Sequence, residues 1–283
     1  MKEITLNSKG KINLLLDVTA RRENGYHDIV TIMQSVSLSD TVTVEKTEDG
    51  IIYIESDFDN IVSPEDNIVY KALKLMKEEY CLKEGFRAII KKNIPIAGGM
   101  GGGSTNAAAA IKAVNILCDL SEPMEKLMKV GVRLGADVPF CIHEKCAICR
   151  GVGDEITETV GLSNVKIVIV NPKTFVSTKE IYELVDEKCK LGKIDENAAI
   201  DALKNSKLSE YKNVLKNIMQ PVTAEICPQI EEIVRGLREL GALHSMMSGS
   251  GPTCFGIFDK DIDEKIVKER FKDYFVVVTE PTA

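Results

Sequence analysis

Alternating hydrophobic and polar positions dominate the first part of the chain. Apolar side chains recur at about every second residue through 11–19, 29–38, 40–46 and 50–56, which is the spacing of a strand with one buried face. The segment ENGYH, residues 23–27, separates the first two runs and is rich in turn-forming residues, so it predicts a hairpin. We therefore expect strands that form an antiparallel sheet.

Helical spacing takes over further along the chain. Residues 63–82 open with cap-type residues and then place apolar side chains three and four positions apart, which predicts a helix. Residues 86–95 predict a strand that ends in a proline, and residues 106–117 and 124–135 predict two helices. The glycine-rich run at 98–103 thus lies directly between a strand and a helix.

This glycine-rich run is the first candidate site. Glycine occupies five of the six positions from 98 to 103, and Ser104 and Thr105 follow at once. A flexible linker would be flanked by polar sequence without periodicity, and a tight turn without a ligand would need fewer glycines. Glycine is required where φ is positive or where a ligand approaches the main chain, and N–H groups at a helix N-terminus bind anions. We predict a phosphate-binding loop in which Ser104 or Thr105 caps the helix.

Composition and charge narrow the class of protein. The chain has 283 residues, which suggests about two domains, and its 44% hydrophobic and 28% charged residues are ordinary for a globular protein. A net charge of −7 argues against a nucleic-acid partner. The sequence has neither an apolar run long enough for a membrane span nor a signal peptide at its start. We expect a cytoplasmic protein with no membrane partner.

Three cysteines raise an alternative. Cys141, Cys146 and Cys149 have the C-x4-C-x2-C spacing of one type of iron–sulfur protein. A rival hypothesis is therefore a binding module that holds a nucleotide or a redox centre and catalyses no reaction. A fourth ligand is not evident, and residues 145–151 read as a short buried strand in which cysteine acts as a small hydrophobic residue. In such a strand Cys146 and Cys149 point to opposite faces.

The glycine loop fits neither of two well-known phosphate-loop patterns but resembles a third. Ser104 stands where a Walker loop has lysine, and no Rossmann fingerprint can be placed on these glycines. Residues 95–108, PIAGGMGGGSTNAA, resemble the ATP loop of the GHMP kinases, P-x-x-x-G-L-G-G-G-S-S-x-A-A, with Met100 for Leu and Thr105 for the second Ser. The resemblance implies ATP as phosphoryl donor with Mg²⁺ and assigns no protein ligand to the metal, although Ser104 is a candidate contact. It places these residues at the nucleotide: Asn67, Lys92, Pro95, Ile96, Ala97, Gly98, Gly99, Met100, Gly101, Gly102, Gly103, Ser104 and Thr105.

The same resemblance implies the fold. GHMP kinases are α+β proteins of two domains, an N-terminal one like domain 2 of ribosomal protein S5 and a C-terminal ferredoxin-like α/β sandwich. We expect them at residues 1–160 and 161–283, with the active site in the cleft between them. Residues 246–258, MMSGSGPTCFGIF, resemble the third motif of the family, a glycine loop that packs against the first.

Further segments point to one branch of the family. Residues 11–42, 135–142 and 151–156 are similar, in order, to the branch whose acceptor is 4-diphosphocytidyl-2-C-methyl-D-erythritol, although NSKGK at 7–11 replaces the usual Pro-Ala-rich lead. The resemblance implies phosphorylation of the 2-hydroxyl of that acceptor in the non-mevalonate isoprenoid pathway. The alternative is another GHMP kinase that acts on homoserine or mevalonate.

Two residues are candidates for the chemistry of phosphoryl transfer. Asp137, in GADVP, is the candidate base for the acceptor hydroxyl, and the simpler interpretation is an aspartate that stops a helix. Lys11 begins an apolar strand, where a lysine is usually solvated; the resemblance places it beside Asp137. Asn13 is two residues further on, so its side chain projects from the same face of the strand and is a candidate to bind substrate.

The resemblance also assigns the cytidine end of the acceptor. It implies that Tyr26 and His27 stack on and hydrogen-bond the cytosine and that Tyr182 covers its other side. The simpler interpretations are a hairpin turn at Tyr26 and a core position on a helix for Tyr182. We therefore expect ATP and a small cytidine-diphosphate sugar alcohol as partners, with the chain acting as a monomer or homodimer.

Overall fold

The computed structural model describes residues 1–57 and 63–282, which form two compact units. Unit 1 consists of Met1–Gly10, Leu38–Ile96 and Gly101–Glu144. Unit 2 consists of Lys11–Ser37, Ala97–Met100 and the chain from Lys145 onward. Because the chain passes between the units several times, neither unit is one continuous stretch, and the boundary placed at residue 160 stays a prediction.

Two long strands run through both units and pair with each other. They are β1 (Glu3–Arg21) and β2 (His27–Thr47). The predicted hairpin between them is confirmed, since Arg22 N donates to Tyr26 O at 2.7 Å. The prediction of separate strands at 29–38 and 40–46 is wrong because β2 continues through Asp40, whose buried side chain is satisfied by hydrogen bonds within the fold.

In unit 1 the last part of β2 lies in a mixed sheet. It pairs with β4 (Gly85–Lys91) in antiparallel register, with Thr43 opposite Ile89. The other neighbour of β4 is β3 (Ile52–Ser56), and this pair is parallel, so the expectation of a purely antiparallel sheet is wrong for β3. A helix connects β3 to β4, and such a crossover is what allows two consecutive strands to run parallel.

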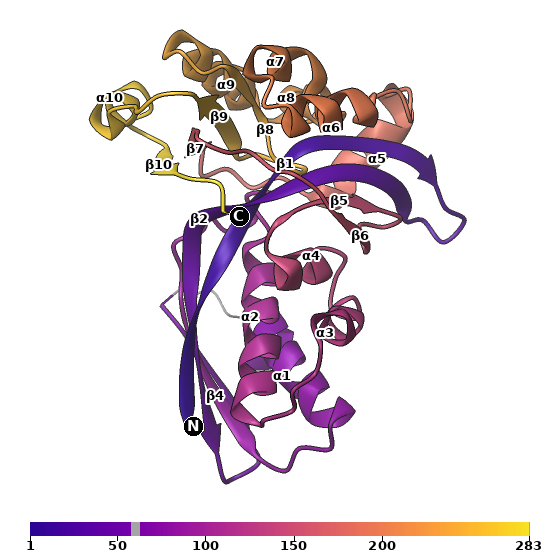
Figure 1. The fold of residues 1–283 in the computed structure, drawn as a ribbon, viewed down its shortest axis with the longest axis vertical. Coiled ribbons are helices and arrows are strands. Elements are labelled where there is room, and N and C mark those ends of the chain that lie inside the picture. The colour runs from indigo at the N-terminus through magenta and orange to yellow at the C-terminus, as the bar shows by residue number, and fades with distance from the viewer. Residues whose placement is uncertain (58–62, 283) are drawn as a thin grey trace. The chain divides into compact units, whose positions relative to one another are not determined.

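The helices of unit 1 gather on one side of these strands (Figure 1). The alanine-rich helix after the glycine run begins at Gly102, four residues before the predicted Asn106, because the glycines already have helical backbone conformation. Its alanines are buried, and their small side chains let the two longest helices of the unit pack closely. The helices are α1 (Ile68–Glu79), preceded by a 3₁₀ turn at Pro64–Asp66, then α2 (Gly102–Leu117), α3 (Met124–Gly131) and α4 (Val138–His143).

Unit 2 contains a second sheet in which neighbouring strands are antiparallel, in the order β10-β7-β9-β8. Its strands are β7 (Lys166–Asn171), β8 (His244–Met247), β9 (Cys254–Phe258) and β10 (Phe275–Thr279). The first part of β2 also lies in this unit and pairs with β5 (Cys146–Arg150), which pairs in turn with β6 (Glu155–Glu158).

Helices supply much of the core of unit 2. Ile230, Ile233 and Leu237 recur at helical spacing on one helix and are fully buried with Val168 and Val170 of the sheet. The helices are α5 (Thr178–Lys188), α6 (Glu196–Lys204), α7 (Tyr211–Val214) after a 3₁₀ turn at Leu208–Glu210, α8 (Gln220–Ile226), α9 (Gln229–Glu239) and α10 (Glu264–Arg270).

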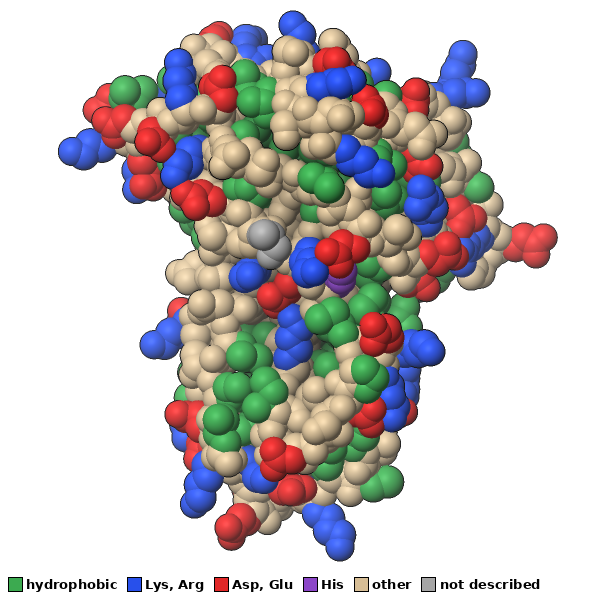
Figure 2. All heavy atoms as spheres, viewed as in Figure 1, with side chains coloured by type: hydrophobic (Ala, Val, Ile, Leu, Met, Phe, Trp, Pro, Cys, Tyr) green, Lys and Arg blue, Asp and Glu red, His purple; other side chains and the backbone are tan. Residues whose placement is uncertain are grey.

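The surface carries charges of both signs. Figure 2 shows acidic and basic side chains interspersed over the face in view, with smaller apolar areas among them. Among the described residues, we find no helix with the length and apolar character that a membrane crossing requires.

Candidate active site

In unit 2 the first part of the glycine-rich run, Ala97–Met100, packs against the late glycine segment, residues 246–258. Gly99 has φ of +77°, and a Cβ placed on it would lie 2.2 Å from the main-chain oxygen of Ser248. The Ser248 hydroxyl donates to Gly99 O at 3.0 Å, and Thr253 N donates to Gly98 O at 3.3 Å. Residues 246–258 therefore contact the first loop as expected, and the glycine at 99 is required both by its backbone conformation and by this close approach.

Lys11 and Asn13 adjoin the same glycine segment. Lys11 N donates to Met100 O at 3.1 Å, and its ammonium Nζ donates to Asn13 Oδ1 at 2.8 Å. Asn13 Nδ2 donates to Thr31 Oγ1 at 2.9 Å, and Asn13 N donates to the Ser248 hydroxyl at 3.2 Å. Lys11 and Asn13 are only 4% and 3% exposed, so the interpretation of Lys11 as a solvated surface charge is wrong. Lys11 is thus a buried cation with polar contacts, and its role toward a phosphate stays a prediction.

In unit 1 the second half of the loop forms the start of α2. Gly101 is the N-cap residue, with φ of +68°, and no side chain caps the helix. The expectation that Ser104 or Thr105 is the cap is therefore wrong, because the helix begins before both residues. Thr105 is buried and its hydroxyl donates to Lys9 O at 2.6 Å, whereas Ser104 is half-buried and Gly103 is exposed. Main-chain N–H groups at an uncapped helix start can bind a phosphate.

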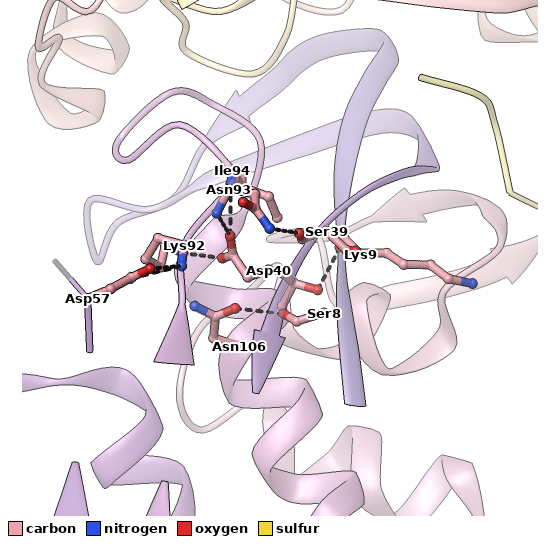
Figure 3. Close-up of polar contacts among 10 residues, drawn as sticks. Ser8, Lys9, Ser39, Asp40, Asp57, Lys92, Asn93, Ile94 and Asn106 are labelled. Atoms are coloured by element: carbon pink, nitrogen blue, oxygen red, sulfur yellow. Dashed lines mark hydrogen bonds and ion pairs between the residues drawn. The ribbon is translucent and has the colours of Figure 1, made fainter. Parts of the chain in front are cut away.

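A buried aspartate organises the chain that leads into the loop (Figure 3). Asp40 has no exposed surface and accepts hydrogen bonds from Asn93 N at 2.7 Å and from Ile94 N at 2.8 Å. Its other oxygen pairs with the ammonium of Lys92. That ammonium is 3.4 Å from the place a Cβ on Gly102 would take, so Lys92 lies beside the first residue of α2. Asp40 thereby holds a cation next to the start of α2.

Further hydrogen bonds hold the residues on either side of the glycine loop. Asp57 accepts from Lys92 N at 3.0 Å, and the hydroxyl of Ser8 donates to Asn106 Oδ1 at 2.6 Å (Figure 3). Asn67 caps α1 by accepting from Val69 N at 2.8 Å. The next residue, Ile68, would be 3.6 Å from a Cβ on Gly103. Asn67 and Lys92 are thus both close to the glycine loop, and their roles toward a nucleotide stay predictions.

Asp137 stands at the N-terminal end of α4. The tight turn Gly135–Val138 precedes the helix, with Val138 N donating to Gly135 O at 3.1 Å, and Cys141 N donates to Asp137 O at 3.0 Å. Asp137 is half-buried and is the N-cap residue of α4, so the interpretation as an aspartate that stops a helix is wrong.

The segment expected to bind cytosine forms a distinct cluster in unit 2. Tyr26 is 65% exposed on the hairpin turn. The next residue, His27, stacks on Tyr182 with ring centroids 4.6 Å apart and ring planes 18° apart, and its Nε2 is 2.8 Å from Asp186 Oδ1. Arg21 contacts the other oxygen of Asp186 at 3.2 Å. Tyr182 also packs against the core of unit 2, so its two interpretations are compatible.

Sequence reasoning missed several residues that build these clusters. Asp40 follows Ser39 within the sequence of a strand, where it gives no local sign of a buried role. Ser248 belongs to the motif at residues 246–258, whose pattern does not distinguish it from its neighbours. Asp186 lies one helical turn after Tyr182, a spacing that places both side chains on one face of α5 and offered a local signal.

All three cysteines of the motif are buried. Cys146 and Cys149 lie in β5, as predicted, and both are buried. Burial raises the pKa of the Cys146 thiol to about 12, which disfavours the thiolate that an iron–sulfur cluster requires. Within residues 1–57 and 63–282, no group of three or more His, Cys, Asp and Glu side chains is placed to hold a metal ion.

Comparison with known families supports a kinase. The model of the GHMP kinases N terminal domain matches residues 67–145, and the model of the GHMP kinases C terminal domain matches residues 199–277. These matches include the glycine loop, Asp137 and the late glycine segment.

Individual proteins resemble the chain over nearly its full length. Proteins named 4-diphosphocytidyl-2-C-methyl-D-erythritol kinase from Lachnoclostridium phytofermentans and Clostridioides difficile are each 39% identical over 98% of this chain, covering 94% and 95% of their own lengths. A crystal structure of 4-(cytidine 5'-diphospho)-2C-methyl-D-erythritol kinase superposes with a TM-score of 0.81 at 26% identity, covering 98% of this chain and 99% of that one. Homoserine kinase from Cytophaga hutchinsonii reaches 0.83 at 17% identity, over 100% of this chain and 95% of its own, which shows a shared fold alone. The predicted two-domain α+β fold is confirmed.

Proposed function

The chain belongs to the GHMP kinase family, and we propose that it transfers the γ-phosphate of ATP to the 2-hydroxyl of 4-diphosphocytidyl-2-C-methyl-D-erythritol. This reaction belongs to the non-mevalonate route to isoprenoid precursors. The observation that carries the proposal is the 39% identity to kinases of that name along 98% of the chain. The aligned 98% of the chain includes both glycine loops and the hairpin segment, so the similarity does not depend on one motif alone.

The glycine loop binds the phosphates of ATP in this proposal. Its support is the uncapped start of α2 at Gly102, the exposed Gly103, and the ammonium of Lys92 beside them. Main-chain N–H groups and a neighbouring cation together stabilise phosphate oxygens. Asn67 and Ile96 extend this surface toward the nucleoside, since Asn67 begins α1 next to the loop and Ile96 is 49% exposed.

The acceptor hydroxyl is activated by Asp137. Phosphoryl transfer needs a group that takes the hydroxyl proton and cations that hold the charge of the transferred phosphoryl group. Asp137 takes the proton, and Lys11 supplies positive charge at the reacting oxygens. Asn13 acts as a positioning residue, because its amide oxygen accepts from the Lys11 ammonium at 2.8 Å and limits the directions in which that ammonium can point.

Mg²⁺ accompanies ATP in this proposal. Mg²⁺ binds phosphate oxygens of the nucleotide in this chemistry, and the hydroxyl of Ser104, which is half-buried near the start of α2, is the contact that we propose from this chain. The metal neutralises phosphate charge when bound.

The cytidyl group is held at the hairpin. The exposed ring of Tyr26 offers a face for stacking. His27 follows Tyr26 directly in the sequence and stacks on Tyr182. Aromatic side chains stack on bases of any kind, so a hydrogen-bonding group such as His27 is needed for selectivity.

An acceptor panel tests the proposal. ADP release is measured with Mg²⁺-ATP and 4-diphosphocytidyl-2-C-methyl-D-erythritol, the same compound without its cytidyl group, mevalonate or homoserine. Turnover with the first acceptor alone supports the proposal, and preferential turnover of mevalonate or homoserine overturns the substrate. A nucleotide that binds without any turnover overturns the kinase assignment for this chain. The cytoplasmic location stays a prediction.

A further inference from the structure

The contacts of His27 reveal a residue that family resemblance did not assign. Its Nε2 is 2.8 Å from Asp186 Oδ1, and the second oxygen of that carboxylate is 3.2 Å from the guanidinium of Arg21. The side chains of His27 and Asp186 are 7% and 16% exposed, whereas that of Arg21 is 61% exposed. Asp186 therefore bridges a nearly buried imidazole and a surface cation.

This carboxylate determines which imidazole nitrogen carries the proton. An ionised carboxylate only accepts hydrogen bonds, and a guanidinium only donates them. Asp186, ion-paired with Arg21, must therefore accept a hydrogen bond from the Nε2–H group of His27. In the neutral ring the other nitrogen, Nδ1, then has a lone pair and is an acceptor.

The ring is also fixed in orientation. Stacking on Tyr182, at 4.6 Å and 18°, fixes the plane of the His27 ring, and the hydrogen bond to Asp186 fixes its rotation within that plane. Tyr182 and Asp186 are four residues apart on α5, so one helix face supplies both restraints. The direction of Nδ1 is thereby set before any substrate arrives, which lowers the entropy lost on binding.

An acceptor at this position selects the chemistry of the base. We infer that Asp186 is a positioning residue that makes His27 Nδ1 an acceptor for the exocyclic amino group of a pyrimidine, so that the kinase prefers cytidyl over uridyl substrates. Uracil presents a carbonyl oxygen where cytosine presents its amino group, and two facing acceptors leave both groups without a hydrogen bond. The inference rests on the proposed function, because it concerns the base of the same substrate.

The decisive variant is Asp186→Asn. Asparagine offers one acceptor and one donor, and Arg21 attracts the amide oxygen because a guanidinium only donates. The amide NH₂ then faces His27 Nε2, which must become the acceptor, and the proton moves to Nδ1. Glu183→Gln is the matched control, since Glu183 is on the same helix, 63% exposed, and pairs only with Lys179 at 3.9 Å among the ion pairs of the described residues.

The first measurement compares kcat/KM for 4-diphosphocytidyl-2-C-methyl-D-erythritol and its uridyl analogue. The wild-type protein and Glu183→Gln are expected to prefer the cytidyl compound by the same ratio. In Asp186→Asn this ratio falls at least about tenfold, which corresponds to about 1.4 kcal/mol, because the cytosine amino group then faces a donor and loses its hydrogen bond. The change lies in KM for the acceptor, while KM for ATP is retained. An unchanged ratio in Asp186→Asn overturns the inference.

A second measurement does not depend on activity. Nitrogen NMR of protein labelled at its three histidines, recorded with the rings neutral, reports which nitrogen of His27 is protonated. We expect Nε2–H in the wild type and Nδ1–H in Asp186→Asn, and the same tautomer in both proteins overturns the inference. A wild-type protein that turns over neither nucleotide compound overturns the proposed function instead, while the NMR result still decides the role of Asp186.

Discussion

Gly99→Ala tests whether the close packing of the two glycine segments shapes the ATP site. The new Cβ would lie 2.2 Å from Ser248 O and 3.2 Å from both N and O of Gly251, all of them main-chain atoms. Main-chain atoms cannot rotate away as a side chain can, so one of the two segments must shift. The same shift disturbs the hydrogen bond from the Ser248 hydroxyl to Gly99 O.

The cost has three sources. A left-handed backbone costs alanine about 1–2 kcal/mol, overpacking costs about 1–3 kcal/mol, and a lost hydrogen bond costs about 1 kcal/mol. Gly241→Ala is the matched control, because Gly241 has φ of +96° and its added Cβ would meet nothing within 4 Å. The control therefore bears only the backbone cost, and Gly99→Ala is expected to lose about 2–4 kcal/mol more.

Thermal melting at one scan rate and the KM for ATP are the two assays. For a chain of this size, the extra loss lowers Tm by at least about 4 °C beyond the control. The KM for ATP rises in Gly99→Ala and stays unchanged in Gly241→Ala. If the two variants melt at the same temperature and bind ATP equally well, the contact between Gly99 and Ser248 is not needed for the site.

Three further predictions concern single side chains. Asp137→Asn should lower kcat at least about 10²-fold with ATP affinity retained; near-normal turnover would remove Asp137 from the mechanism. Tyr26→Ala should raise the KM for the cytidyl acceptor and leave that for ATP unchanged, and a parallel rise of both would contradict stacking. Burial, with a smaller effect of Arg238, lowers the pKa of His244 from 6.5 to about 4, so the unfolded state binds the proton first and wild-type stability falls as pH drops from about 6.5 to 4, by about 3 kcal/mol at most. His244→Gln should lose less stability over that interval, and equal pH dependence in melts of both proteins would refute the shift.

Local sequence determined the elements and the kind of loop. The strand before Pro95, the helix after the glycines and the hairpin at Tyr26 all follow from short-range periodicity and turn chemistry. These signals act within a few residues of each other, which is why they can be read without a fold. The same reasoning misplaced the start of α2 by four residues, because glycines are poor helix formers in isolation and the prediction began at the first alanine-rich position.

Only the tertiary structure decided which distant residues meet. Ser248 reaches Gly99 across 149 positions, and Asp186 reaches His27 across 159. The parallel pairing of β3 with β4 and the burial of Asp40 inside β2 also depend on neighbours supplied by other elements. The physical reason is that local patterns report which face of an element is buried, whereas hydrogen-bond partners depend on strand register and side-chain packing between segments far apart in the chain.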